Sequence, residues 1–201
     1  MEETTLQERI QKISLAEGKT RGVVMKPDIQ FIIRKRGREG VEQVENEMEK
    51  LGVPLDLDNI RISKYYPIGI RTIFLLTAKR ILGFSDQDMR EMGTEVPKFS
   101  SIMRFFMKSF LMDENVFFQK APSYWEKFVS VGEVTVPYFD AGRNVATVRL
   151  DDFNIDPVFC PYVEGVFSSF VKIITGANKV HSKETECSFK GGDYHEFELS
   201  W

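Results

Sequence analysis

Residues 159–199 read FCPYVEGVFSSFVKIITGANKVHSKETECSFKGGDYHEFEL, and this stretch decides the fold. Apolar residues recur at helical spacing through its first half, which predicts a helix over about 161–175. Gly176 follows as a left-handed cap. The segments 179–189 and 194–201 then flank a Gly-Gly-Asp turn, so the chain should end in a β-hairpin.

The residues upstream of this stretch predict a second hairpin and a series of helices. β-branched residues fill 133–139 and 145–150, which flank a five-residue turn containing Asp, Gly and Asn. Helical patterns and their end signals occupy 27–37, 40–52, 67–83, 85–93, 102–111 and 123–128. The order helices, hairpin, helix, hairpin predicts an α+β fold. N-terminal helices pack on an antiparallel sheet made of two hairpins, with one long helix between the hairpins.

Length and composition indicate one globular domain over residues 1–201, mainly helical over 1–130, with the hairpins and their helix at 131–201. Apolar residues make up 42% and charged residues 28% of the chain, and its 17 Phe require a large core or a lined cavity. The net charge of -3 argues against a nucleic-acid-binding surface spread over the protein. The N-terminus is polar and the apolar runs are too short to cross a bilayer, so we predict a cytoplasmic protein.

Four residues of the C-terminal region have the chemistry of zinc ligands: Cys160, Glu184, Cys187 and His195. A three-residue turn would pair Phe189 with His195 and would put Cys187 and His195 on one side of the hairpin. A regular strand would point Glu184 and Cys187 apart unless a bulge intervenes. On spacing alone the alternative stays open that the cysteines are small buried apolar residues and the histidine is a solvated strand residue.

The same stretch resembles the end of the 4-vinyl reductase domain. In that family a Cys precedes a helix with an internal Gly, and a strand carries Glu-x-x-Cys before a Gly-Asp turn, a third Cys and an aromatic residue. Those places are taken here by Cys160, Gly165, Glu184, Cys187, Gly192, Asp193 and Phe197, while His195 replaces the third Cys. The resemblance implies a structural zinc held by Cys160, Glu184, Cys187 and His195, as in sensory domains of aromatic-responsive bacterial regulators.

Residues 22–52, with Tyr66-Pro67 beyond them, resemble the wider superfamily of heme nitric-oxide-binding domains and TRAPP vesicle-tethering subunits. The resemblance implies an apolar cavity between helices and sheet. We place this ligand pocket among aromatic residues, namely Phe105, Phe106, Phe110, Trp125 and Phe139. No heme is expected, because His181 and His195 both belong to the last hairpin and no helix supplies an axial imidazole.

These observations favour a sensor or regulatory module that binds a small apolar or aromatic ligand and contains a structural zinc site. A homodimer and a downstream protein partner are expected, without nucleic acid and without a transmembrane segment. The alternatives are an accessory protein or enzyme of tetrapyrrole (4-vinyl) reduction and a TRAPP-like protein-interaction scaffold. No catalytic residues are identified, so an enzyme is less expected than a binding module. The basic run Arg34, Lys35, Arg36 and Arg38 is either a solvated helix end or a contact for phosphate or an anionic membrane.

Overall fold

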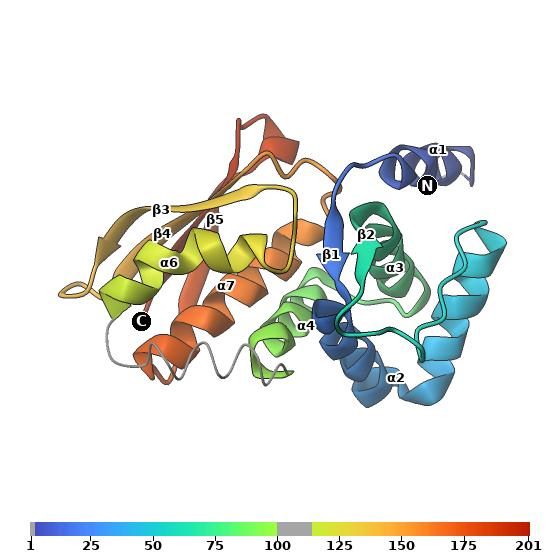
Figure 1. Cartoon of the computed structure of the whole chain (residues 1–201), viewed down its shortest axis with the longest axis horizontal. Coiled ribbons are helices and arrows are strands. Elements are labelled where there is room, and N and C mark those ends of the chain that lie inside the picture. The colour runs from blue at the N-terminus through green and yellow to red at the C-terminus, as the bar shows by residue number, and fades with distance from the viewer. Residues whose placement is uncertain (1–2, 100–113) are drawn as a thin grey trace.

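The computed structural model describes residues 3–99 and 114–201 and has an α+β fold (Figure 1). Along the chain the elements are α1 (Glu3–Ser14), β1 (Lys19–Arg21), α2 (Gly22–Lys50), β2 (Tyr65–Pro67), α3 (Ile68–Ile81), α4 (Asp86–Phe99), α6 (Glu114–Glu126), β3 (Glu133–Asp140), β4 (Val145–Asp151), α7 (Phe159–Thr175), β5 (His181–Glu186), η1 (Ser188–Lys190) and β6 (His195–Ser200). In Figure 1 the large sheet with α6 and α7 lies on one side of the molecule, and α1 to α3 lie on the other. Within the described ranges, no helix is both long and apolar enough to cross a membrane.

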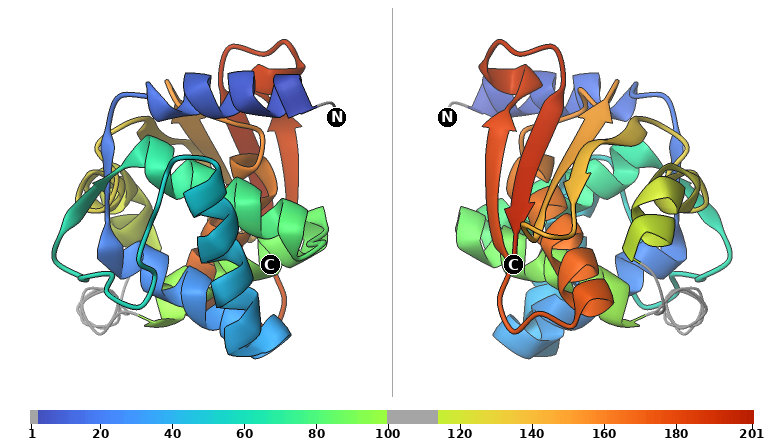
Figure 2. Two further views of the ribbon diagram at one scale, coloured as in Figure 1. Left: turned by 90° about the vertical axis from the view of Figure 1, so that its right-hand side faces the viewer. Right: turned by 90° about the vertical axis from the view of Figure 1, so that its left-hand side faces the viewer.

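Both predicted hairpins form, and together they make one antiparallel sheet in the order β3-β4-β6-β5. The central strands alternate strictly: Ala146, Val148 and Leu150 of β4 are buried, while their neighbours in sequence are half-exposed. This period of two gives the sheet one apolar face, which α6 and α7 cover. The sheet seen from its other side, with α7 behind it, is shown in Figure 2. The expected α+β arrangement of two hairpins and an intervening helix is confirmed.

The N-terminal helices differ from expectation in two places. Residues 3–14 form α1, because Leu6, Ile10 and Ile13 share one face and are buried. The two helices predicted over 27–37 and 40–52 both form and meet at a kink at Gly37, where the backbone leaves the helical region with φ 72° and ψ -175°; α2 spans both. The first of them begins at Gly22 instead of Pro27. A short antiparallel pair, β1 with β2, was also not predicted.

The predicted helix end at Gly93 is wrong, because α4 continues to Phe99. Gly93 serves a different purpose: a Cβ there would lie 2.1 Å from the Tyr162 carbonyl oxygen of α7. Gly165 of α7 has the same role on the other helix, since a Cβ added there would lie 2.0 Å from the Arg90 carbonyl oxygen of α4. The two glycines therefore let the backbones of α4 and α7 approach within contact distance. Ser85 and Asp88 form a capping box at the start of the same helix, where each backbone amide donates to the side chain of the other residue.

Candidate functional site

The structure brings the four predicted metal donors together. One ligand atom from each of Cys160, Glu184, Cys187 and His195 lies within 4.8 Å of those from the other three. Cys187 and His195 are buried, with 4% and 3% of their surface exposed, while Cys160 and Glu184 are half-buried. Donors from α7, β5, β6 and the turn that follows β5 thus meet where the N-terminus of α7 contacts the last hairpin.

Local backbone irregularities place the donors on the hairpin. Glu184 pairs with Phe197 and Glu186 pairs with Glu196, so the register shifts by a bulge between Glu184 and Glu186. This bulge turns the Glu184 side chain to the same side as Cys187, which a regular strand would not allow. The predicted pairing of Phe189 with His195 is wrong, because β5 ends at Glu186 and the turn is longer than three residues.

The longer turn is held by backbone hydrogen bonds. The amides of Lys190 and Gly192 both donate to the Cys187 carbonyl oxygen, at 2.9 and 3.0 Å. Between them Gly191 adopts φ 98°, a left-handed conformation that favours glycine. Cys187 is therefore the first residue of the turn. The turn also brings Ser188 beside His195 and Lys190 beside Glu184.

Donor separations match those of a tetrahedral zinc shell. The Sγ atoms of Cys160 and Cys187 are 3.8 Å apart, too far for a disulfide. Two sulfurs at the usual zinc–sulfur distance lie about 3.8 Å apart in a tetrahedron. His195 Nδ1 and Glu184 Oε1 are 3.3 Å apart, and a nitrogen and an oxygen on zinc lie about 3.4 Å apart. Four protein donors leave no open position, so such a site holds structure and does not activate water.

Two further side chains orient the donors. Ser188 Oγ lies 2.7 Å from His195 Nε2. If the ring donates its Nε2 proton to Ser188, Nδ1 is free to bind a metal. Lys190 Nζ donates to Glu184 Oε2 at 3.0 Å, which directs Oε1 toward the other donors. Two thiolates and a carboxylate around a divalent cation leave one negative charge, and Lys190 offsets it.

The close packing of the four donors shifts the pKa values of Cys160 and Glu184 in opposite directions. Burial raises the pKa of the Cys160 thiol, and the neighbouring Glu184 and Cys187 raise it further. Burial also raises the pKa of Glu184, but hydrogen bonds from Lys190, His195 and Cys187 outweigh burial and hold it below its ordinary value.

A second feature is an apolar cavity of about 90 Å³ between α6, α7 and the sheet. Aromatic rings form much of its wall, including Phe117, Phe118, Trp125, Phe153, Phe159 and Phe167. Several of these rings also contact one another edge to face, such as Trp125 with Phe153 at 5.5 Å between centroids. The Phe-rich composition is thus concentrated where helices and sheet meet.

One end of the cavity is polar, which the sequence did not reveal. Arg71 of α3 and Tyr162 of α7 line it, and both contact Asp28 of α2. The Tyr162 hydroxyl donates to Asp28 Oδ1 at 2.7 Å and accepts from Arg71 Nη2 at 2.6 Å. Burial raises the pKa of Asp28 to about 6, and the charge of Arg71 and the hydrogen bond from Tyr162 offset it only in part. The sequence placed Asp28 only within the helix predicted over 27–37 and in no candidate site.

The predicted pocket residues are distributed as follows. Trp125 lines the cavity, and its indole nitrogen donates to the Val131 carbonyl oxygen at 2.9 Å. Phe139 packs on Phe118 and Trp201, with centroids 4.4 and 6.3 Å away. The other three predicted residues, Phe105, Phe106 and Phe110, lie outside the described residues.

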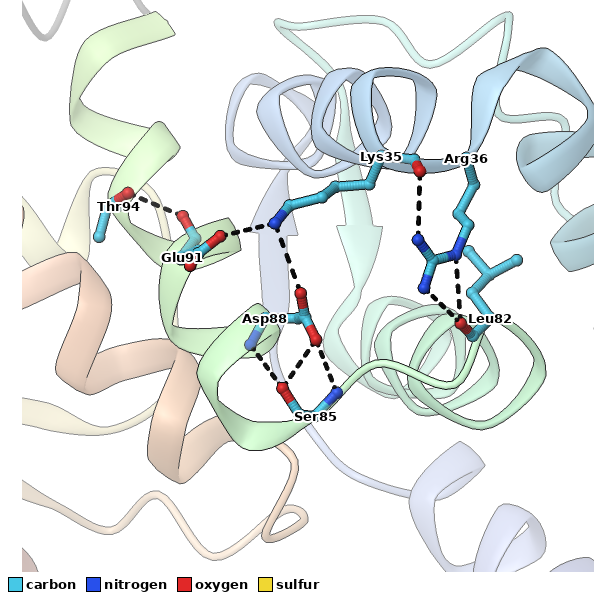
Figure 3. Close-up of polar contacts among 7 residues, drawn as sticks. All are labelled: Lys35, Arg36, Leu82, Ser85, Asp88, Glu91 and Thr94. Atoms are coloured by element: carbon cyan, nitrogen blue, oxygen red, sulfur yellow. Dashed lines mark hydrogen bonds and ion pairs between the residues drawn. The ribbon is translucent and has the colours of Figure 1, made fainter.

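The basic run of α2 makes internal contacts rather than an open patch. Figure 3 shows Lys35 bridging to Glu91 and Asp88 of α4, and Arg36 donating to the Leu82 carbonyl oxygen at the end of α3. The remaining members pair with carboxylates, Arg34 with Glu95 and Arg38 with Asp58. Lys35 and Arg36 thus hold α2 against α4 and α3, contacts that neither sequence interpretation included, while all four basic residues remain solvent-exposed.

Among the described residues that line the cavity, two have side chains of a type that can ligate heme iron, Tyr124 and Tyr162. His181 and His195 lie at the starts of β5 and β6, and neither lines it.

No protein-family model matches the chain, and no curated protein matches its sequence. Solved structures do share its fold. An H-NOX protein from S. oneidensis in the Fe(II)NO ligation state has a TM-score of 0.66 at 13% identity, over 90% of this chain and 98% of that one. An oxygen-binding H-NOX domain related to soluble guanylate cyclases has a TM-score of 0.61 at 12% identity, over 90% and 94%.

A third structure, described as modulating heme redox potential through protein-induced porphyrin distortion, has a TM-score of 0.60 at 11% identity, over 90% and 99%. These neighbours overturn the expectation of no heme, because they are heme proteins built on the same fold. The chain thus has the fold of H-NOX domains.

Proposed function

We propose that this chain is a sensor module, one domain over residues 1–201, that binds a small apolar or aromatic molecule in the cavity beneath α6. The observation that carries this proposal is the partly open, aromatic-lined cavity with a polar end formed by Arg71 and Tyr162. Binding sites for small molecules are typically concave, mostly apolar and furnished with few polar groups. The likeness in fold to H-NOX proteins that bind NO or oxygen supports a small-molecule ligand for this chain.

The cavity volume constrains how a ligand enters. A volume of about 90 Å³ is smaller than the roughly 150 Å³ cavity that takes up benzene in another protein. A single aromatic ring therefore requires the lining rings to rotate or α6 to shift outward. Heme, which the neighbours contain, requires a larger displacement of the same helix.

We further propose that Cys160, Glu184, Cys187 and His195 hold a structural zinc, as the resemblance to the 4-vinyl reductase domain implies. The donor separations of 3.8 and 3.3 Å support it. A bound zinc would join α7 to the last hairpin, so its binding free energy would become folding free energy. The cytoplasmic location, the homodimer and a downstream protein partner stay predictions.

Native mass spectrometry of the full chain tests both parts. The protein is measured as purified, then after addition of zinc, and then after incubation with toluene or with hemin in separate samples. We expect one zinc per chain and one bound apolar molecule. A chain that binds no zinc refutes the metal site, and a chain that takes up neither toluene nor hemin refutes the ligand-binding function.

A further inference from the structure

Arg71 is a buried cation at the wall of an otherwise apolar cavity. It projects from α3, only 4% of its surface is exposed, and it lines the cavity. Its guanidinium lies 5.7 Å from the ring centroid of Phe159 and 5.0 Å from that of Tyr162. Burying a charge is unfavourable unless partners compensate it, so the number of its partners is informative.

The partners of Arg71 use only part of its hydrogen-bonding capacity. Both hydrogen bonds start from Nη2, one to Asp28 Oδ2 at 3.3 Å and one to the Tyr162 hydroxyl at 2.6 Å. An arginine has five N–H donors and no acceptor. Its Nε is buried and has no hydrogen-bond partner anywhere in residues 3–99 and 114–201. A buried donor without an acceptor is costly, and an acceptor brought by a ligand would remove that cost.

Charge balance indicates what kind of acceptor fits. Asp28 is fully buried and already pairs with Arg71, so the two opposite charges cancel. A ligand carboxylate would add an uncompensated negative charge in apolar surroundings, which is unfavourable. A hydroxyl would need an acceptor for its own proton, whereas a carbonyl oxygen only accepts and therefore complements a group that only donates.

We propose that the cavity selects an aromatic molecule carrying one neutral carbonyl oxygen, as in aryl ketones and aldehydes, and that Arg71 donates to this oxygen. This inference rests on the proposed ligand-binding function and names the ligand class of the same cavity. The ring lies among the aromatic side chains, and the carbonyl points to the polar end formed by Arg71, Asp28 and Tyr162.

The test compares acetophenone with α-methylstyrene, in which a CH₂ group replaces the carbonyl oxygen at nearly the same shape. Dissociation constants are measured by calorimetry or ligand-observed NMR on the full, zinc-supplemented chain. We expect acetophenone to bind at least about tenfold more tightly, because a hydrogen bond from a charged donor is involved. Benzoate, which carries a negative charge, is expected to bind more weakly than acetophenone.

Two variants separate the hydrogen bond from the apolar contacts. Arg71→Met keeps the length of the side chain and removes its donors, so the two ligands should bind it equally. Phe170→Leu alters the apolar wall and should weaken both ligands by the same factor, which keeps their ratio. If Arg71→Met does not fold, the comparison of ligands on the wild-type chain still decides.

Equal affinities of the wild-type chain for acetophenone and α-methylstyrene would overturn this inference and leave the proposed function standing. Tighter binding of benzoate would overturn the choice of a neutral acceptor. Failure of all the aromatic ligands to bind would overturn the inference and the ligand-binding function together.

Discussion

Replacing Ser188 by alanine tests the metal site without removing a donor. In the structure Ser188 Oγ lies 2.7 Å from His195 Nε2, on the opposite side of the ring from Glu184. Loss of the hydroxyl frees the imidazole to rotate and to change tautomer, so Nδ1 is no longer held toward the other donors. We therefore expect Ser188→Ala to fold and to bind zinc more weakly than the wild type.

The size of the effect follows from the role of such partners. Removing a group that orients a metal ligand costs about 10- to 100-fold in metal affinity. At a fixed free zinc concentration above the dissociation constants, this loss lowers the free energy of unfolding by about 1.4–2.7 kcal/mol. For a chain of this length the melting temperature should fall by roughly 3–10 °C.

The assay has two parts. Zinc affinity is measured by competition with a chromogenic chelator, and thermal unfolding is measured in zinc-buffered solution and again with EDTA. The matched control is Ser168→Ala on α7, whose hydroxyl donates to the Glu164 carbonyl oxygen at 2.7 Å and not to any of the four donors. The control should keep wild-type zinc affinity. Our reasoning fails if Ser188→Ala binds zinc as tightly as the wild type, or if its loss of stability is the same with EDTA.

Two other predictions concern the polar end of the cavity and the helix contact beside it. Because burial raises the pKa of Asp28 from 3.8 to about 6, the native state holds this proton more tightly than the unfolded state does. As the pH rises from about 4 to about 6, the free energy of unfolding should therefore fall by up to about 3 kcal/mol relative to that of Asp28→Asn, measured by urea titration. A difference between the two proteins that does not change with pH would contradict this. Gly165→Ala should lower it by more than about 2 kcal/mol, because the added Cβ would lie 2.0 Å from the Arg90 carbonyl oxygen. Gly142→Ala, whose Cβ would meet its nearest atom at 3.4 Å, is the control and should stay within about 0.5 kcal/mol; equal effects would refute the close-approach argument.

The C-terminal elements could be predicted because their signals are local. The helix over 161–175 has a dense apolar stripe and a glycine that adopts φ 69° at its end. The strands alternate, and the turn residues between them have recognisable chemistry. The four candidate donors were selected differently, because their spacing alone left a non-metal alternative open and only the family resemblance grouped them. The structure brings these four side chains together.

Other features depend on contacts between distant parts of the chain and were missed. Gly93 was interpreted as a helix end because glycine often ends helices, but here it admits the backbone of α7. The register of the last hairpin could not be predicted, because the bulge after Glu184 and the turn after Cys187 each add residues. α1 had a readable signal in Leu6, Ile10 and Ile13, which follow helical spacing within a polar segment.

Arg71 had no readable signal at all. A single arginine in an apolar helix is ordinarily interpreted as solvent-exposed, since its long side chain can reach water. Its burial becomes favourable only through Asp28 and Tyr162, which lie 43 and 91 residues away in the sequence. Sequence patterns report the local period of a helix, and they do not report which side chains from distant parts of the chain will contact that helix in the core.

One helix serves both candidate sites, and this restricts how it can be oriented. Cys160 and Tyr162 are two residues apart on α7, so their side chains diverge by about 200° around the helix axis. Cys160 faces the metal donors of the hairpin, while Tyr162 faces Arg71 and the cavity. A rotation of α7 about its axis would separate both pairs at once and would also turn Gly165 away from α4. The stretch that begins at Phe159 therefore decides the fold because strand pairing, helix contact, metal donors and cavity wall all require the same orientation of one helix.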